Sequence, residues 1–155
     1  MKLYYAIGAV ISPFISVVFW VYNRLGGVVR PRILVMNAAG EVLLVRSWTG
    51  HQGWELPGGG KSCHETAEDA ARREVKEELG VDLAGRPLVN VGTITANGYV
   101  APLFKIVLSE RVVITRNKWE LSGAAWYDTS NLPAYLGPAA RWLFENNIQK
   151  TDDLL

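Results

Sequence analysis

The stretch that decides the fold runs from Gly59 to Val81 and reads GGKSCHETAEDAARREVKEELGV. Within it, Thr66 followed three residues later by Asp69 is typical of a helix N-cap, because a short polar side chain there accepts a backbone hydrogen bond. Gly80 can end the helix, because glycine readily adopts the left-handed backbone conformation that follows the last turn of many helices. The stretch therefore predicts a loop followed by one helix from about Thr66 to Leu79, which ends at Gly80.

The predicted helix carries an acidic arc beside an apolar stripe. The stripe would face a core and consists of Ala71, Val75 and Leu79. At roughly 100° per residue, Glu74, Glu77 and Glu78 fall on one narrow arc next to it. Repulsion between like charges at this spacing lowers helix stability by about a few tenths of a kcal/mol per pair. A bound divalent cation would turn this repulsion into attraction. Mg²⁺ and Mn²⁺ prefer such oxygen ligands, and the alternative interpretation is a solvated acidic face.

The flanking residues decide between these interpretations. Gly59 is followed after five residues by Glu65, and after seven more by the run REVKEELGV from Arg73 to Val81. This order resembles the signature box of the Nudix hydrolases at every fixed position. The resemblance implies an α/β fold, a Nudix-type α/β/α sandwich with a mixed sheet, over about residues 28–147. It also implies Mg²⁺-dependent hydrolysis of a diphosphate, in which metal-bound water attacks phosphorus.

The same resemblance implies metal ligands within the box. Glu74, Glu77 and Glu78 match the metal-binding glutamates of the family, with Mg²⁺ as the expected ion and Mn²⁺ as a substitute. The backbone carbonyl of Gly59 matches a further ligand, and glycine lets the backbone approach a metal and a phosphate without a Cβ in the way. Arg73 would orient Glu77 across one helical turn.

Catalysis is expected to depend on Glu77, Glu78, Arg73 and Glu120, while the choice of general base stays open. Glu120 lies just before a predicted strand, where many members of the family carry a glutamate that serves as base or extra ligand. The alternative for Glu120 is an exposed loop carboxylate. Glu65 would hold the loop or favour the positive end of the helix, and in the family it also approaches the metal cluster through water.

Four side chains outside this acidic set are candidate substrate contacts. Lys61 could touch a phosphate, although a loop lysine is usually solvated. Trp48 and Trp54 could stack on a base, although core packing is the commoner fate of such tryptophans. Tyr99 lies near the position of a tyrosine that resembles one in dinucleoside polyphosphate hydrolases.

The substrate class follows from the resemblance only in outline. A nucleoside diphosphate linked to another group is the expected substrate, because most relatives use one. A lipid-linked diphosphate at a membrane and a non-catalytic nucleotide-binding Nudix module are the alternatives. The formal net charge of +1 gives no sign of a nucleic-acid polymer as partner.

The N-terminal part differs in character from the rest of the chain. From Leu3 to Tyr22 no side chain is charged, and a helix of this length can cross the roughly 30 Å hydrocarbon layer of a bilayer. We therefore expect residues 1–27 to form a hydrophobic helix and hinge, with residues 3–22 as a membrane anchor, and residues 28–155 to form the hydrolase domain. A cleaved signal and a helix on the enzyme's own surface are the alternatives.

Charges and small residues around this segment suggest its topology. Arg24, Arg30 and Arg32 follow the apolar run, so the positive-inside rule places the hydrolase domain on the cytoplasmic side. A face of small residues spaced four apart could support a helix-mediated homodimer, and it consists of Gly8, Ser12 and Ser16. Cys63 is the only cysteine, which excludes an intrachain disulfide and is compatible with a reducing compartment.

The remaining elements are read from apolar runs and turn residues, and we expect His51 and His64 to lie on the surface. Glycine-containing turns at residues 37–40 and 97–98 predict two hairpins. The predicted strands are Ile33–Met36, Val42–Val45, Leu88–Ala96, Tyr99–Ser109 and Gly123–Tyr127. A second helix is predicted at Pro138–Asn147, with proline in its first turn and Trp142 and Leu143 facing inward.

Overall fold

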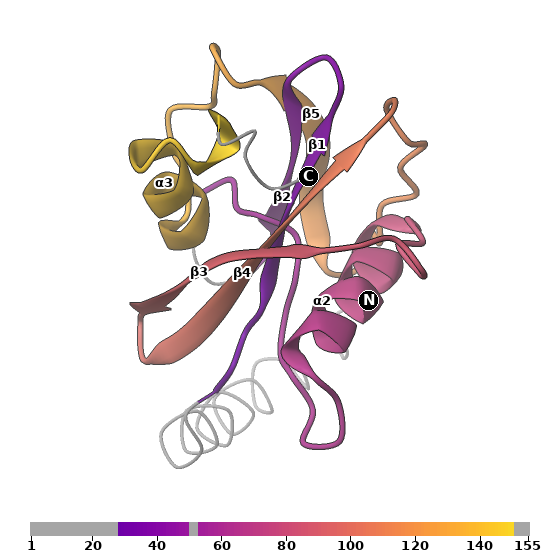
Figure 1. Ribbon diagram of the computed structural model, residues 1–155, viewed down its shortest axis with the longest axis vertical. Coiled ribbons are helices and arrows are strands. Elements are labelled where there is room, and N and C mark those ends of the chain that lie inside the picture. Colours follow the sequence, from indigo (N-terminus) through magenta and orange to yellow (C-terminus); the bar gives the residue numbers. More distant parts are fainter. Residues whose placement is uncertain (1–27, 50–52, 151–155) are drawn as a thin grey trace, which may run out of the picture.

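The computed structural model describes residues 28–49 and 53–150, and these form one mixed sheet with helices on both of its faces (Figure 1). The sheet order is β3-β4-β1-β2-β5. The strands are β1 (Arg32–Asn37), β2 (Glu41–Ser47), β3 (Val89–Ala96), β4 (Tyr99–Leu108) and β5 (Leu121–Asp128). The helices are α2 (Ala67–Leu79), α3 (Pro138–Glu145) and the short 3₁₀ helix η1 (Ile148–Lys150).

Strand β1 makes the sheet mixed. It pairs in parallel with β4, with Arg32 opposite Leu103, while every other pair of neighbouring strands is antiparallel. The β3–β4 hairpin turns at Asn97 and Gly98, whose φ angles are 51° and 78°. Both are left-handed, as a tight two-residue hairpin turn requires. The α/β sandwich with a mixed sheet, expected from the sequence, is confirmed.

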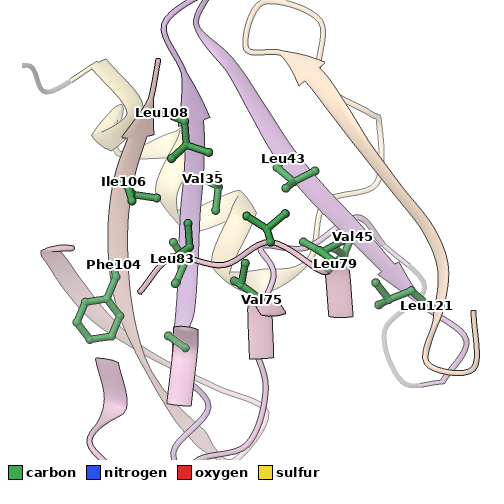
Figure 2. Close-up of a cluster of buried hydrophobic side chains, with 13 residues drawn as sticks. Val35, Leu43, Val45, Val75, Leu79, Leu83, Phe104, Ile106, Leu108 and Leu121 are labelled. Atoms are coloured by element: carbon green, nitrogen blue, oxygen red, sulfur yellow. The ribbon is translucent and has the colours of Figure 1, made fainter. Parts of the chain in front are cut away.

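Alternating side chains of the central strands supply two separate cores. Ile33 and Val35 of β1 face α2, and Leu34 and Met36 face α3. Figure 2 shows Val75 and Leu79 of α2 packed toward the strands of the first core. Because side chains alternate across a strand, a buried central strand such as β1 is apolar along most of its length.

The predicted elements differ from the observed ones mainly at their ends. Strand β5 begins at Leu121, two residues before the predicted start, because Leu121 pairs with Ser47 and is fully buried. Helix α3 ends at Glu145, since Asn146 is its C-cap and Asn147 has a left-handed φ of 56°. Leu143 is buried as predicted, and Trp142 is partly buried against the same core.

The expected membrane segment, residues 3–22, and the small-residue face within it lie outside the described residues, as does His51. Within residues 28–49 and 53–150, no helix is long and apolar enough to cross a membrane.

Candidate active site

Helix α2 is held at both ends by its own caps, which fix where its carboxylates lie. The Thr66 hydroxyl accepts from the Asp69 backbone N–H at 3.0 Å. Gly80 has a φ of 69°, and its N–H donates to the Lys76 carbonyl at 2.9 Å. The buried stripe at Ala71, Val75 and Leu79 sets the rotation of the helix. The acidic arc therefore lies at the edge of the core, as the spacing predicts.

Glu78 is the buried member of the arc. Its residue surface is only 7% exposed, and its Oε2 accepts from the Gly58 backbone N–H at 3.0 Å. Burial raises the pKa of this carboxyl to about 7, and the nearby charges of Glu74 and Glu120 add to the rise. A carboxyl group with a pKa near neutrality can both take up and release a proton at physiological pH.

Glu74 packs directly on the backbone of Gly59. A Cβ atom built on Gly59 would overlap the Glu74 carboxylate, so no larger residue fits there without moving that side chain. Burial raises the pKa of Glu74, and its hydrogen bond with Arg73 opposes the rise. This close contact gives a physical reason for glycine at the start of the box.

Arg73 joins the loop before α2 to the carboxylates on it. Its Nε and Nη2 donate to the two oxygens of Glu65 at 3.1 and 2.9 Å, and Nη2 also donates to the Gly60 carbonyl at 2.8 Å. Its Nη1 donates to Oε1 of Glu74 at 2.9 Å and to Oε2 of Glu77 at 3.0 Å. The predicted pair with Glu77 is present. The two hydrogen bonds to Glu65 also fix the position of the Arg73 side chain.

The charges of this cluster stabilise one another. Hydrogen bonds from Arg73 and from the Ser62 backbone hold the pKa of Glu65 at about 2, and Glu65 in turn raises the pKa of Arg73. Glu65 thus holds the loop in the way the sequence suggested. A bidentate arginine–carboxylate pair fixes orientation as well as charge.

The donor chemistry of the arc fits a hard divalent cation. Among the described residues, Oε2 of Glu74, Oε1 of Glu77 and Oε1 of Glu78 accept no hydrogen bond. As the side chains lie, the carboxylates are held by Arg73 and Gly58, and within the described ranges no group of three or more His, Cys, Asp or Glu is placed to hold an ion. The oxygen-only set, with the exposed-edge position of Glu77, is of the type that Mg²⁺ and Mn²⁺ prefer.

Glu120 is brought to the same end of α2 by the segment before β5. The backbone N–H of Asn117 donates to the Glu78 carbonyl, and that of Thr115 to the Leu79 carbonyl, both at 2.8 Å. Glu120 itself is exposed, and its charge contributes to the raised pKa of Glu78. Glu120 therefore lies near enough to Glu78 for its charge to act there, and its role as base or extra ligand stays a prediction.

A cavity of about 510 Å³ opens beside Glu78. Gly58, Gly59 and Glu78 line one part of it, and the Asn97–Gly98 turn with Tyr99 lines another. Tyr99 is the one candidate substrate contact from the sequence among the described residues of this lining. The cavity meets the acidic arc at Glu78 and is large enough for a nucleotide-sized ligand.

The other candidate contacts lie elsewhere. Trp54 stacks edge-on against Tyr127, with ring centroids 4.9 Å apart, which agrees with the core-packing interpretation. Trp48 is 60% exposed, and its indole N–H donates to the Lys118 carbonyl at 3.0 Å. The Lys61 ammonium donates to the Ser62 carbonyl at 2.9 Å. These three side chains are not among the described residues that line the cavity.

Comparison with known sequences places the fold and the box in one family. The sequence profile of the NUDIX domain matches residues 28–146. This chain belongs to the Nudix family. A crystal structure of a MutT Nudix hydrolase from Burkholderia pseudomallei superposes with a TM-score of 0.67 at 23% identity, covering 76% of this chain and 95% of that one. This likeness supports the Nudix fold assigned above.

Curated relatives of this Nudix chain match over limited lengths. An RNA pyrophosphohydrolase from a Marinomonas species is 44% identical over 50 residues, 32% of this chain and 30% of that protein. A putative 8-oxo-dGTP diphosphatase 3 from Mycobacterium tuberculosis is 33% identical over 108 residues, 63% of this chain and 49% of that protein. Subunit 2 of the mRNA decapping complex of Schizosaccharomyces pombe is 26% identical over 141 residues, 77% of this chain and 19% of that protein. The Nudix chain thus spans less than half of each of these relatives.

Sequence reasoning missed two parts of this Nudix site. Glu55 accepts from the backbone N–H groups of Ala139 and Ala140 at 3.1 and 2.7 Å, and so caps α3 from 84 residues away in sequence. The signal was Gly137, which precedes the helix and has no side chain to cap it. Arg30 and Arg32 also line the cavity, although the sequence analysis assigned them only to membrane topology.

Proposed function

We propose that this chain is a Mg²⁺-dependent pyrophosphohydrolase that cleaves a diphosphate bond in a nucleoside diphosphate derivative or nucleotide. The observation that carries the proposal is the arc of Glu74, Glu77 and Glu78, which Arg73 and Gly58 hold and whose member Glu78 lines a nucleotide-sized cavity. The names of two relatives, RNA pyrophosphohydrolase and putative 8-oxo-dGTP diphosphatase, point to the same bond type.

In this proposal, some residues of the site hold the metal and Arg73 orients them. The carboxylates of Glu74, Glu77 and Glu78 with the Gly59 carbonyl would hold Mg²⁺ or Mn²⁺, which supplies an activated water and neutralises phosphate charge. Arg73 keeps Glu74 and Glu77 oriented toward the loop that carries Gly59 and Gly60. An arginine that orients ligands in this way acts on the metal site without touching the substrate.

Two carboxylates are the candidates to receive the proton of the attacking water. Glu78 borders the cavity, and its pKa of about 7 in the metal-free protein suits proton exchange. Glu120 is exposed and is not a metal ligand in this proposal. Replacing Glu120 by Gln separates the two: loss of kcat with unchanged Mg²⁺ activation identifies Glu120 as the base, and unchanged kcat leaves Glu78.

The experiment that tests the activity is a panel of phosphate esters with purified full-length protein and Mg²⁺. The panel contains nucleoside triphosphates, nucleoside diphosphate sugars, dinucleoside polyphosphates and a 5′-triphosphorylated RNA oligonucleotide. Phosphate or pyrophosphate release from at least one class supports the proposal. Binding of a nucleotide with no turnover in Mg²⁺ or Mn²⁺ identifies the chain as a non-catalytic nucleotide-binding module instead.

A second candidate function is favoured by the uncharged run from Leu3 to Tyr22. Such a segment would anchor the enzyme in a membrane with its catalytic domain in the cytoplasm, and it would raise the local concentration of a lipid-linked diphosphate. Full-length enzyme in vesicles and a form lacking residues 1–27 distinguish the two candidates. A lipid-linked substrate should lose far more kcat/KM on truncation than a soluble nucleotide, whereas equal rates on nucleotides and no lipid turnover remove this candidate.

A further inference from the structure

Two arginines form one wall of the cavity next to the acidic arc. Arg30 and Arg32 flank Pro31 at the start of β1, and both line the cavity together with Glu78 and Tyr99. The Arg30 backbone N–H donates to the Val100 carbonyl at 2.8 Å, and Arg32 pairs in register with Leu103 of β4. Backbone pairing with β4 therefore fixes the Cα positions of these two arginines.

Neither guanidinium lies within ion-pair distance of a carboxylate of the described residues. Within the described residues, Arg30 and Arg32 form no ion pair. Arg32 donates through Nη1 to the Leu56 carbonyl at 3.2 Å and to the Gly58 carbonyl, and Arg30 lies over the Tyr99 ring at 5.5 Å from its centroid. The Nε atom of each arginine is buried and has no hydrogen-bond partner in the described structure.

Such an arrangement costs free energy. Two like charges lie side by side and partly buried, and burial together with the charge of Arg32 lowers the pKa of Arg30. Buried donors without partners are rare in proteins, because the lost hydration is not replaced. Other atoms of both side chains line the cavity, so an anionic ligand there can compensate the two positive charges.

The position of the pair relative to the arc indicates which anion. Arg32 lines the cavity together with Glu78. Its contact with the Gly58 carbonyl joins it to the residue whose N–H holds Glu78. Arg30 continues the line of charge from there to Tyr99 and the β3–β4 turn.

We propose that Arg30 and Arg32 form an anion subsite, which binds a phosphoryl group of the substrate adjacent to the diphosphate held at the carboxylates. This inference rests on the proposed function, because the diphosphate at the arc fixes which phosphoryl group reaches the arginines. Guanidinium groups suit the task, since their planar fork of N–H donors matches phosphate oxygens in two-point contacts. The subsite makes substrates with a third phosphoryl group bind better than diphosphates whose second half is neutral.

The test measures binding separately from hydrolysis. Full-length protein in detergent is titrated calorimetrically with inorganic tripolyphosphate and with pyrophosphate, in EDTA so that no metal contributes. We expect Arg30→Gln to weaken tripolyphosphate binding at least tenfold, and Arg30→Lys to weaken it less, because lysine keeps the charge but not the fork. Arg46→Gln is the matched control: Arg46 lies over Trp54 at 5.3 Å from the ring centroid and does not line the cavity among the described residues.

Arg32→Gln is expected to show the same loss, and thermal unfolding reports whether it is folded. Its bonds to Leu56 and Gly58 carbonyls are structural, so the Arg30 variants decide the matter if Arg32→Gln does not fold. Equal tripolyphosphate affinity in wild type, Arg30→Gln and Arg46→Gln overturns the subsite. An equal loss in Arg46→Gln also overturns it, because the binding is then general attraction to positive charge.

Steady-state kinetics with Mg²⁺ separates this inference from the proposed function. If the enzyme is active, Arg30→Gln should raise KM for a nucleoside triphosphate at least tenfold more than for a nucleoside diphosphate sugar. An active enzyme whose selectivity is unchanged in Arg30→Gln contradicts the subsite and leaves the proposed function standing. A protein that hydrolyses nothing but loses tripolyphosphate binding in Arg30→Gln retains the subsite and loses the proposed function.

Discussion

The backbone N–H of Gly58 donates to Oε2 of Glu78 at 3.0 Å, and among the described residues this is the one hydrogen bond to that buried carboxyl group. One hydrogen bond does not replace the hydration that a charged carboxylate loses on burial. Protonation of Glu78 therefore stabilises the metal-free protein.

The pH dependence of stability follows from this relationship. Glu78 has a folded pKa of about 7 against an ordinary value of 4.5, so between these pH values the folded protein binds more protons than the unfolded chain. The free energy of unfolding must then fall as pH rises through this window, by up to about 3 kcal/mol. Denaturant unfolding in EDTA at pH 5 and pH 8 measures the fall.

The variant Glu78→Gln is the control for this dependence. It should reduce the difference between pH 5 and pH 8, because the amide does not titrate, while the raised pKa of Glu74 leaves a remaining dependence of the same sign. The depressed pKa of Glu65, about 2, acts in the opposite direction and only below the ordinary range of a glutamate, so it does not mask the effect. A wild-type protein equally stable at both pH values contradicts the assigned burial of charge.

Gly59→Ala should disrupt the metal site, whereas Gly60→Ala should not. A Cβ on Gly59 would overlap the Glu74 carboxylate, while a Cβ on Gly60 meets no atom within 4 Å, so the neighbouring glycine is a matched control. We expect Gly59→Ala to lose roughly 10–100-fold in Mg²⁺ affinity or activity, as displaced ligands do. Magnesium titration of hydrolysis measures both variants, and equal curves would show that the contact is unimportant.

Arg73→Lys should impair catalysis, although it preserves the charge. Lysine cannot bridge Glu65, Glu74 and Glu77 at once, so these carboxylates lose their common orientation. We expect about a 10–100-fold fall in kcat with a raised Mg²⁺ requirement. Lys76→Gln, also on α2, breaks the exposed pair with Asp82 beyond the end of the helix and should change kcat less than about twofold. A Mg²⁺ requirement unchanged in Arg73→Lys would argue against an orienting role.

Glu55→Ala should destabilise the fold through helix α3. The change removes the acceptor of the Ala139 and Ala140 N–H groups, for which Gly137 offers no side-chain substitute. Loss of such a cap costs about 1–2 kcal/mol. Glu145→Ala, at an exposed position of the same helix, should cost less than about 0.5 kcal/mol. Denaturant midpoints measure both variants, and equal midpoints would mean that Glu55 does not cap α3.

The parts of the site that the sequence predicts are those set by neighbouring residues. Thr66 and Gly80 cap α2 through contacts within a few residues, and the helical period alone places Glu74, Glu77 and Glu78 on one arc. The β3–β4 turn is equally local, because its left-handed φ angles select asparagine and glycine. Caps and turns of this kind depend on residues that are close in sequence, so they can be predicted without knowing any tertiary contact.

The parts that sequence reasoning missed depend on distant segments. Arg30 and Arg32 reach the cavity because β1 pairs with β4, about seventy positions further along the chain. Glu55 reaches α3 across 84 residues, and Trp54 packs against β5. An arginine pair after an apolar run looks like a topology signal until the sheet register shows where its side chains lie.

The central claim is that the acidic arc on α2 performs Mg²⁺-dependent diphosphate hydrolysis. Its most direct test is the hydrolysis rate of the best substrate of the panel for wild type, Glu77→Gln, Glu78→Gln and, as a control on the same helix, Glu68→Gln, each checked for folding by circular dichroism. Glu68 pairs with Arg72 away from the arc. We predict a roughly 10²–10³-fold fall in kcat for folded Glu77→Gln and Glu78→Gln and less than about a twofold change for Glu68→Gln. Full activity in folded Glu77→Gln and Glu78→Gln would contradict the account.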